Sequence, residues 1–345
     1  MPTNLQFIKS VSGDSVTSLA LTNCFSSAYD IYQLQVNYNN ASGNNNLSIR
    51  LLDSGGSQIS TSTYDMAGLD INAFTTFSEV RSTGNTAFIN TTQVADSDDN
   101  SVGNTIFFQP NSAGYTFMLN QQANITTNDF RGRKMIQVEK STTSATGLQL
   151  FTVSSGTANI KATIYGVKWT MAEKGKLIKI AETNVSSPTS VVSLTGIDTT
   201  YSVYVCRVSE VAPDATNKNL YMRVTKSGSP DSTSNYDSSI YALRSDTTFS
   251  TAQFTNGQHW KTSNYASSTG TGQTMQGLFY LFNFPLADYS YVTNETTSLT
   301  GGNLLIGGQG GGVHTAQSAS DGISFHFSSD NIASGKFVLY GLQRD

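Results

Sequence analysis

Apolar and polar residues alternate along many short segments of the chain. Leu47, Ile49 and Leu51 lie two residues apart, with Ser48 and Arg50 between them. Successive side chains of a strand point to opposite faces, so this spacing predicts a strand with one buried and one wet face. Four further segments show the same alternation, namely Leu148 and Leu150, then Leu220, Met222 and Val224, then Ile323, Phe325 and Phe327, and finally Phe337 and Leu339.

These segments are separated by turns rich in Gly, Asn, Ser and Asp, and no amphipathic helix of three turns stands out. Many short alternating strands between such turns are typical of an all-β protein. The spacing predicts an antiparallel β-sandwich of jelly-roll type, with about eight to ten strands in every 170 residues or so. The order of the strands does not follow from the pattern.

The second half of the chain repeats the first at an offset of about 170 residues, as a search for internal periods reveals. Blocks of similar residues recur in one order with small insertions between them, which favours duplication over a shared bias in composition. The matched blocks are 5–9 with 175–179; Tyr29, Tyr32 and Val36 with Tyr201, Tyr204 and Val208; Asn46, Leu47, Arg50, Ser54 and Gly55 with Asn219, Leu220, Arg223, Ser227 and Gly228; 64–65 with 236–237; 76–78 with 248–250; and 164–167 with 339–342.

The repeat predicts two tandem β-sandwich domains, one over residues 1–168 and one over 177–345. Between them, residues 166–176 read GVKWTMAEKGK, a charged stretch after the last strand of one copy and before the first of the next. We place the linker at 169–176. Trp169 in this linker is expected to pack against one domain or to wedge between both, which would set their relative angle.

The composition limits the classes of function. Charged residues make up 13% of the chain, well under the roughly 25% of ordinary soluble proteins, and the formal net charge is −4. Nucleic-acid binders usually carry a basic face, so we expect no nucleic-acid partner. No run approaches the 18 or so apolar residues of a membrane span, so we expect no membrane partner. With 37% hydrophobic residues the chain has enough apolar side chains to bury cores.

The two cysteines, Cys24 and Cys206, are too few for the disulfide framework of small secreted domains. We expect both to be small buried hydrophobes. The three histidines, His259, His314 and His326, all lie in the second half at spacings unlike paired metal ligands. His326 aligns with Phe151, which favours an ordinary strand residue.

Three other motifs suggest chemistry only weakly. Asp96, Asp98 and Asn100 begin like a calcium loop, but the sixth position is not Gly and the twelfth is not Glu. The glycine-rich run at 301–312 lacks the Gly-Lys-Ser/Thr of a phosphate loop and favours a mobile loop or a close-packed bend. The triplet at 13–15 resembles one esterase signature, without a histidine in its own half. We therefore expect no catalytic residue, no cofactor and no metal.

Two groups of residues are candidate contacts with partners. Arg131, Arg133 and Lys134 form a basic cluster whose aligned positions in the second half, Gly301, Asn303 and Leu304, are neutral. This cluster is either a contact with an acidic neighbour in an assembly or a solvated turn.

Trp260, with Tyr265 and Asp246, is a candidate glycan contact, because aromatic faces and carboxylates commonly meet in sugar sites. Asp65 and Asp237 each follow a tyrosine at an expected turn, where a carboxylate can accept backbone N–H groups.

The repeated segments resemble a known family. The endings at 160–168 and 336–343 share an apolar-X-apolar-Tyr-Gly-apolar pattern. With the Arg50 and Arg223 strands, their Ser-Gly turns and the Tyr-Asp pairs, they are similar to repeat domains of tailed-bacteriophage virion structural proteins. The resemblance implies a virion role, in which such proteins decorate capsids or build fibres and tail appendages, commonly as homotrimers. It also implies other virion proteins as partners and a place on the virion surface after assembly in the host cytoplasm.

Fibres and spikes usually have a dedicated anchoring segment, whereas this chain is expected to enter its first strand within about five residues. We therefore expect a non-enzymatic accessory capsid decoration or cement protein, or a compact tail or fibre appendage subunit. Two alternatives stay open: a double jelly-roll major capsid protein, and a carbohydrate-binding receptor-recognition module for a host-surface glycan. An enzyme acting on such a glycan would need a carboxylate pair roughly 5 to 9.5 Å apart.

Overall fold

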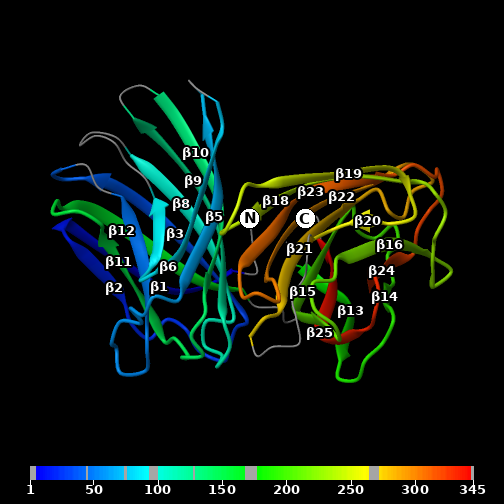
Figure 1. Cartoon of the computed structure of the whole chain (residues 1–345), viewed down its shortest axis with the longest axis horizontal. Helices are drawn as coiled ribbons and strands as arrows, with labels where there is room; N and C mark the ends of the chain where they lie inside the picture. The colour runs from blue at the N-terminus through cyan, green and yellow to red at the C-terminus, as the bar shows by residue number, and fades with distance from the viewer. Residues whose placement is uncertain are drawn as a thin grey trace. The chain divides into compact units, whose positions relative to one another are not determined.

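The chain folds into β-strands that form two compact units, β1–β12 and β13–β25 (Figure 1). The computed structural model describes residues 5–43, 46–73, 76–92, 100–126, 129–167, 177–263 and 272–342, and these residues contain no α-helix. Within this described part, no helix could cross a membrane. The expectation of an all-β chain is confirmed. The predicted linker at 169–176, with Trp169, lies outside the described residues.

The first unit has two facing antiparallel sheets. Its large sheet has the order β1 (Leu5–Val16), β12 (Ala158–Val167), β3 (Ile31–Asn40), β8 (Ser101–Phe108), β9 (Thr116–Thr126), β10 (Asp129–Glu139), β5 (Tyr64–Asn72) and β6 (Ser78–Asn85). Its small sheet has the order β2 (Ser18–Leu21), β11 (Gly147–Thr152), β4 (Leu47–Leu52) and β7 (Phe88–Thr92).

The second unit has the same arrangement. Its large sheet runs β13 (Leu177–Val185), β25 (Ile332–Leu342), β15 (Val203–Pro213), β21 (Met275–Phe282), β22 (Ser290–Leu299), β23 (Leu305–His314), β18 (Tyr236–Arg244) and β19 (Ser250–Gly257). Its small sheet runs β14 (Val192–Thr195), β24 (Gly322–Phe327), β16 (Leu220–Lys226) and β17 (Ser229–Pro230), and β20 (Trp260–Lys261) also pairs with β16.

The large sheets of the two units have the same strand order. In the small sheets, β2, β11, β4 and β7 of the first unit correspond to β14, β24, β16 and β20 of the second. Duplication as the origin of this likeness stays a prediction. The predicted eight to ten strands per unit was too low, since the described residues form twelve (eight plus four) and thirteen (eight plus five). The strands that were missed are short, like β17 and β20, or mostly exposed, like β6 (SEVRSTGN), so they carry no alternation of apolar residues.

Each unit has a hydrophobic core between its two sheets. Leu47, Ile49 and Leu51 on β4 are buried in the first core, as the alternation predicted. Leu220 and Met222 on β16 have the same place in the second core. Burying a side chain of this size stabilises a fold by roughly 1.5 to 3 kcal/mol, so these cores supply most of the favourable free energy of folding.

A buried tyrosine in each unit closes a loop through its hydroxyl group. The Tyr32 hydroxyl donates to the Ser26 carbonyl oxygen at 2.6 Å and accepts from the Ser26 N–H at 2.7 Å. In the second unit the Tyr204 hydroxyl donates to the Asp198 carbonyl oxygen at 2.6 Å and accepts from its N–H at 2.9 Å. Because both hydrogen-bonding functions of the hydroxyl are satisfied, the ring can be fully buried.

The Tyr-Gly ending of each copy has a packing reason. A second tyrosine, Tyr29 or Tyr201, places its ring directly on the last-strand glycine. A Cβ atom would lie 2.5 Å from the Tyr29 ring at Gly166 and 2.2 Å from the Tyr201 ring at Gly341. Real Cβ atoms do not approach other atoms so closely, so this position favours glycine.

The glycine-rich run was predicted to be a mobile loop or a close-packed bend, but this holds only for its start: Gly301 and Gly302 lie in a turn, whereas the glycines from 307 to 312 lie in a strand. Residues 305–314 form β23, which lies between β22 and β18 in the large sheet. A Cβ would lie 2.5 Å from Ile240 at Gly308, 2.2 Å from the Ser239 carbonyl oxygen at Gly310, and 2.3 Å from Trp260 at Gly312. Glycine is rare in strands, which explains the wrong prediction, but here other atoms occupy the space that side chains would need.

We predict that Gly341→Ala destabilises the second unit by about 1 to 3 kcal/mol, because the added methyl group must displace the Tyr201 ring or the strand. Denaturant unfolding of the purified full chain measures this. Gly302→Ala is the control, since its Cβ would meet no atom closer than 3.7 Å. Equal stability of the two variants would contradict this explanation of the motif.

Candidate functional site

The predicted basic cluster lies on strand β10 and not in a turn. The Arg133 side chain is buried, with 5% of its surface exposed, and it pairs with Asp70, its cross-strand neighbour on β5. Its Nε and Nη2 atoms donate to the two carboxylate oxygens of Asp70, with an Nη2–Oδ2 distance of 2.8 Å. A buried bidentate pair of this kind holds two strands together.

Strand pairing also corrects the alignment of this cluster. The registers through β9 and β22 show which positions of the two units are equivalent. Arg131, Arg133 and Lys134 are equivalent to Ile306, Gly308 and Gln309. They are not equivalent to Gly301, Asn303 and Leu304.

Since neighbouring strand residues face opposite sides, Arg131 and Arg133 share one face of the sheet and Lys134 lies on the other. The three therefore do not form one basic patch for one partner, and Arg133 belongs to the interior.

Trp260, the central residue of the predicted glycan contact, is buried. Trp260 is 1% exposed and lies in the core, where its indole N–H donates to the Val313 carbonyl oxygen at 3.1 Å. Its ring packs edge-on against Tyr236, with centroids 5.1 Å apart, as Phe88 packs against Tyr64 at 4.9 Å in the first unit. A buried ring offers no face to a sugar, so Trp260 is a core residue.

The other two members of that group are placed differently. Asp246 forms a bidentate pair with Arg244, with distances of 3.0 and 2.9 Å. Tyr265 lies outside the described residues, as do Asp96 and Asp98 of the calcium-like motif. In the part of the chain that the structure describes, no group of three or more His, Cys, Asp or Glu side chains could hold a metal ion.

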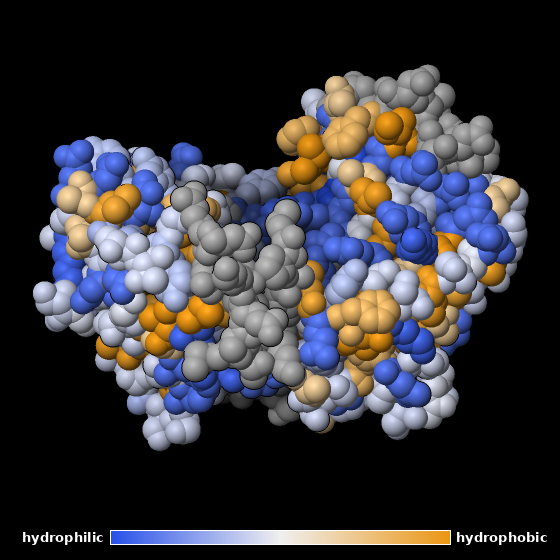
Figure 2. All heavy atoms as spheres, turned by 180° about the vertical axis from the view of Figure 1, so that it is seen from behind, coloured by the Kyte–Doolittle hydropathy of each residue, from blue (hydrophilic) through white to orange (hydrophobic). Residues whose placement is uncertain are grey.

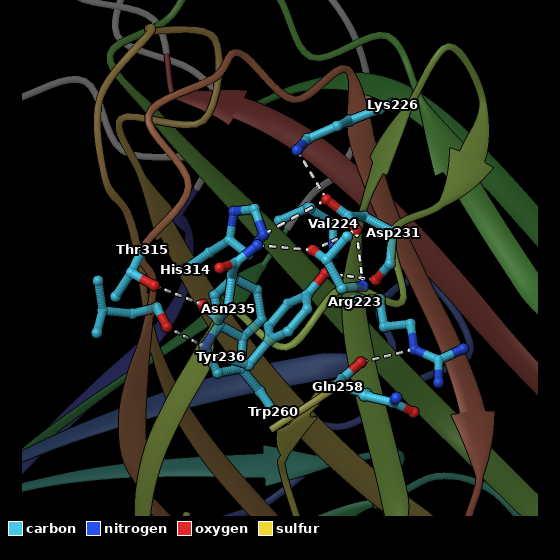
Figure 3. A network of polar contacts seen from close by, with 12 residues as sticks. Arg223, Val224, Lys226, Asp231, Asn235, Tyr236, Gln258, Trp260, His314 and Thr315 are labelled. Atoms are coloured by element: carbon cyan, nitrogen blue, oxygen red, sulfur yellow. Dashed lines mark hydrogen bonds and ion pairs between the residues drawn. The ribbon is translucent and has the colours of Figure 1, made fainter. Parts of the chain in front are cut away.

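A polar network lies at the edge of the second core, with Asp231 and His314 buried and Lys226 half-buried (Figure 3). Lys226 Nζ lies 2.7 Å from Asp231 Oδ2, and the same carboxylate oxygen lies 3.6 Å from His314 Nε2. Below them the Tyr236 hydroxyl donates to the Asp231 carbonyl oxygen at 2.7 Å, and the Val224 N–H donates to that hydroxyl at 3.2 Å. The network joins β16, the loop after β17, and the ends of β18 and β23.

The groups in this network have shifted pKa values. Burial alone would raise the pKa of Asp231, but hydrogen bonds from Lys226 and Thr233 outweigh it and hold the pKa at about 2. Burial lowers the pKa of His314, with a further lowering by the charge of Lys226 and an opposing effect of Asp231. At neutral pH, Asp231 is therefore an anion paired with a lysine and His314 is a neutral imidazole.

The first unit fills the equivalent positions with other residues. The Tyr64 hydroxyl donates to the Ile59 carbonyl oxygen at 2.7 Å, so Ile59 stands where the second unit has Asp231. Glu139, the last residue of β10, stands where β23 has His314. Its carboxylate accepts from the Thr63 hydroxyl at 2.6 Å and from the Ser141 N–H at 2.7 Å.

The structure also brings together two histidines that their sequence spacing did not connect. His259 stacks on Tyr221 with centroids 3.8 Å apart, and the His326 ring lies 5.6 Å from the His259 ring. Tyr221 and His326 are on β16 and β24 of the small sheet, and His259 directly precedes β20. Burial, followed by the charge of Arg223, lowers the pKa of both imidazoles to about 4. In the first unit, the positions equivalent to Tyr221, His259 and His326 hold Ser48, Ala87 and Phe151, respectively.

A hollow of about 700 Å³ lies on the large sheet of the second unit. It is lined by residues of four neighbouring strands, among them Ser239 on β18, Gln253 on β19, Tyr291 and Thr293 on β22, and Gly311 on β23. No sequence signal marked it, because its residues are far apart along the chain and individually ordinary.

The burial of both cysteines and the bonding of Asp65 and Asp237 to backbone N–H groups are confirmed, but the two aspartates lie within β5 and β18 and not at the expected turns. The Asp65 carboxylate accepts from the Gly84 N–H at 2.9 Å, and the Asp237 carboxylate accepts from the Asn256 N–H at 2.7 Å, so both act on backbone at a strand irregularity. Cys24 and Cys206 are free and buried. Burial raises the pKa of Cys24 to about 12 and raises that of Cys206 further. Both residues therefore pack as small hydrophobic side chains.

Comparisons with known proteins give the chain no family. No family model matches it, and no curated protein matches it. Among solved structures, domains LG4-5 of the mouse laminin alpha1 chain align at 9% identity and a TM-score of 0.20, over 97% of this chain and 88% of theirs. The PBSX exported protein XepA gives 6% and 0.16 over 99% and 88%, and the STIV MCP gives 8% and 0.15 over 96% and 93%. Scores this low carry no argument about function.

We predict that acid destabilises the second unit through His259 and His326. Their folded pKa of about 4 lies below the usual 6.5, so between these values the unfolded chain binds more protons and stability falls as the pH falls. His259→Ala with His326→Phe, the first-unit residues, should recover about 1 kcal/mol of the stability lost on acidification, because partial exposure weakens the effect.

Denaturant unfolding at about pH 7 and about pH 4.5 measures this stability. Trp260 fluorescence reports on the second unit, in a background where Trp169 is replaced by phenylalanine. The parent with both histidines is the control. The same loss of stability on acidification in both proteins would contradict the assignment.

Proposed function

We propose that this chain is a non-enzymatic structural protein. The observation that carries the proposal is the presence, in one chain, of two sandwich units with one strand order, whose Tyr-Gly and Tyr-Asp motifs perform packing and backbone hydrogen bonding. The Tyr-Gly ending holds a ring against a strand, and the Tyr-Asp pair holds a strand irregularity. Two similar units give a subunit two related but distinguishable binding faces, which suits a repeated building block.

We propose further that the building block belongs to a virus particle, as an accessory capsid decoration or cement protein, or as a compact tail or fibre subunit of a tailed bacteriophage. The support is the resemblance of the repeated motifs, together with the roles that these motifs have in the fold. A homotrimer on the virion surface, with other virion proteins as partners, is part of the same proposal. Sedimentation of the purified chain would test the trimer against three times the 37.0 kDa chain mass.

The surface suits such a role. Figure 2 shows hydrophilic and intermediate side chains over most of the visible face, with apolar ones in small groups. Since charged residues are only 13% of the chain, much of this polarity comes from neutral hydrogen-bonding groups. Contacts made by neutral groups depend little on ionic strength, which favours an assembly that must survive outside a cell.

We predict that purified virus particles from the native source contain this chain at a fixed copy number, on the order of tens of copies for an appendage and of hundreds for a protein that covers a capsid. Quantitative mass spectrometry of the particles measures it. Deleting the gene should leave heads that still assemble.

Two results would change the proposal. Absence of the chain from purified particles would contradict a virion role. Loss of all heads after gene deletion would favour the alternative of a double jelly-roll major capsid protein.

A further inference from the structure

We propose that the hollow on the large sheet of the second unit binds an uncharged saccharide. This inference stands apart from the virion role, because it concerns what the folded chain binds and not where the chain is assembled. It also replaces Trp260, Tyr265 and Asp246 as the place where a glycan would bind.

Comparison of equivalent positions in the two units shows how the hollow arises. In the first unit this face of the large sheet carries the apolar side chains of Phe117, Leu119 and Ile136. The strand registers place Tyr291, Thr293 and Gly311 at the same positions in the second unit.

The branched side chain of Ile136 is thus replaced by a glycine, and Leu119 by a smaller hydroxyl-bearing residue. These smaller residues contribute to a hollow of about 700 Å³ in the second unit. Ligand pockets in proteins commonly measure roughly 300 to 1,000 Å³.

The lining matches the two kinds of surface that a sugar ring presents. Tyr291 is 45% exposed at the rim, and Tyr280, the cross-strand neighbour of Thr293, is 43% exposed beside it. An exposed aromatic ring can pack on the C–H face of a sugar.

Hydroxyl and amide groups that can pair with sugar hydroxyls also line the hollow, beside apolar residues. These polar groups belong to Ser239, Gln253, Thr255 and Thr293. Each can both donate and accept a hydrogen bond, as sugar hydroxyls do.

The charge of the lining selects an uncharged ligand. Among the described residues that line the hollow, Asp237 is the one carboxylate, and no lysine or arginine is present. One oxygen of Asp237 is already occupied by the Asn256 N–H at 2.7 Å. A sulfated or sialylated sugar would find no cation among these lining residues to offset the loss of its hydration, so a neutral sugar is favoured.

An array of oligosaccharides tests this on the purified full chain. The array carries neutral chains built from glucose, galactose and N-acetylglucosamine, with matched sialylated and sulfated forms. We expect binding to one or more neutral members, followed by titration calorimetry with the best of them. Tyr291→Ala should weaken binding tenfold or more. Thr293→Leu, which restores the residue of the first unit, should do the same by filling the hollow.

Tyr289→Ala is the matched control, because Tyr289 is also an exposed tyrosine but does not line the hollow. It should bind as the unchanged chain does. Circular dichroism and thermal unfolding of each variant separate loss of the site from loss of the fold.

Three results would overturn the assignment. The first is no binding to any neutral sugar, the second is binding to charged members alone, and the third is equal affinity of Tyr291→Ala and the unchanged chain. A chain absent from virus particles that still binds a neutral sugar would remove the virion role and keep this site.

Discussion

The single layer of side chains between the two sheets of each unit is the contact on which the rest of the structure depends. Every second residue of the facing strands enters this layer, as Leu47 and Ile49 do in the first unit and Leu220 and Met222 in the second. Packing at this density leaves little freedom to the neighbouring loops. Burial in this layer also favours polar groups that find partners, and the tyrosine hydroxyls do so by bonding to backbone N–H and carbonyl groups.

Toward one end of each sandwich the same layer becomes polar without losing its order. Asn120 on β9 donates from its side-chain amide to the Thr91 carbonyl oxygen at 3.1 Å. Asn294, its counterpart on β22, donates to the Thr262 carbonyl oxygen at 3.0 Å. A buried amide that is paired in this way ties the small sheet to the large one, whereas an unpaired one would cost about 1 to 3 kcal/mol. The shared polar positions are therefore part of the scaffold.

The positions that differ between the units are the ones that give each unit its own chemistry. Ile59 and Glu139 of the first unit are replaced by Asp231, which pairs with Lys226, and by the buried, neutral His314. On the outer face, Gly311 takes the place of a large apolar side chain and opens a hollow. One backbone frame thus carries an apolar face in one unit and a hydroxyl-lined depression in the other. Function on such a scaffold depends on local replacements, as it does on other widely used folds.

The sequence by itself determined the all-β class, the alternation of the core strands, the burial of both cysteines and the capping role of Asp65 and Asp237, because each depends on periodicity or on neighbours along the chain. Only the tertiary structure decided the burial of Trp260 and Arg133, the strand at Gly308 and Gly310, and the meeting of His259 with His326. These depend on residues from strands that are distant in sequence and adjacent in a sheet. A single sequence records which residues alternate, but not which strands pair, since pairing is set by the packing of the whole sandwich.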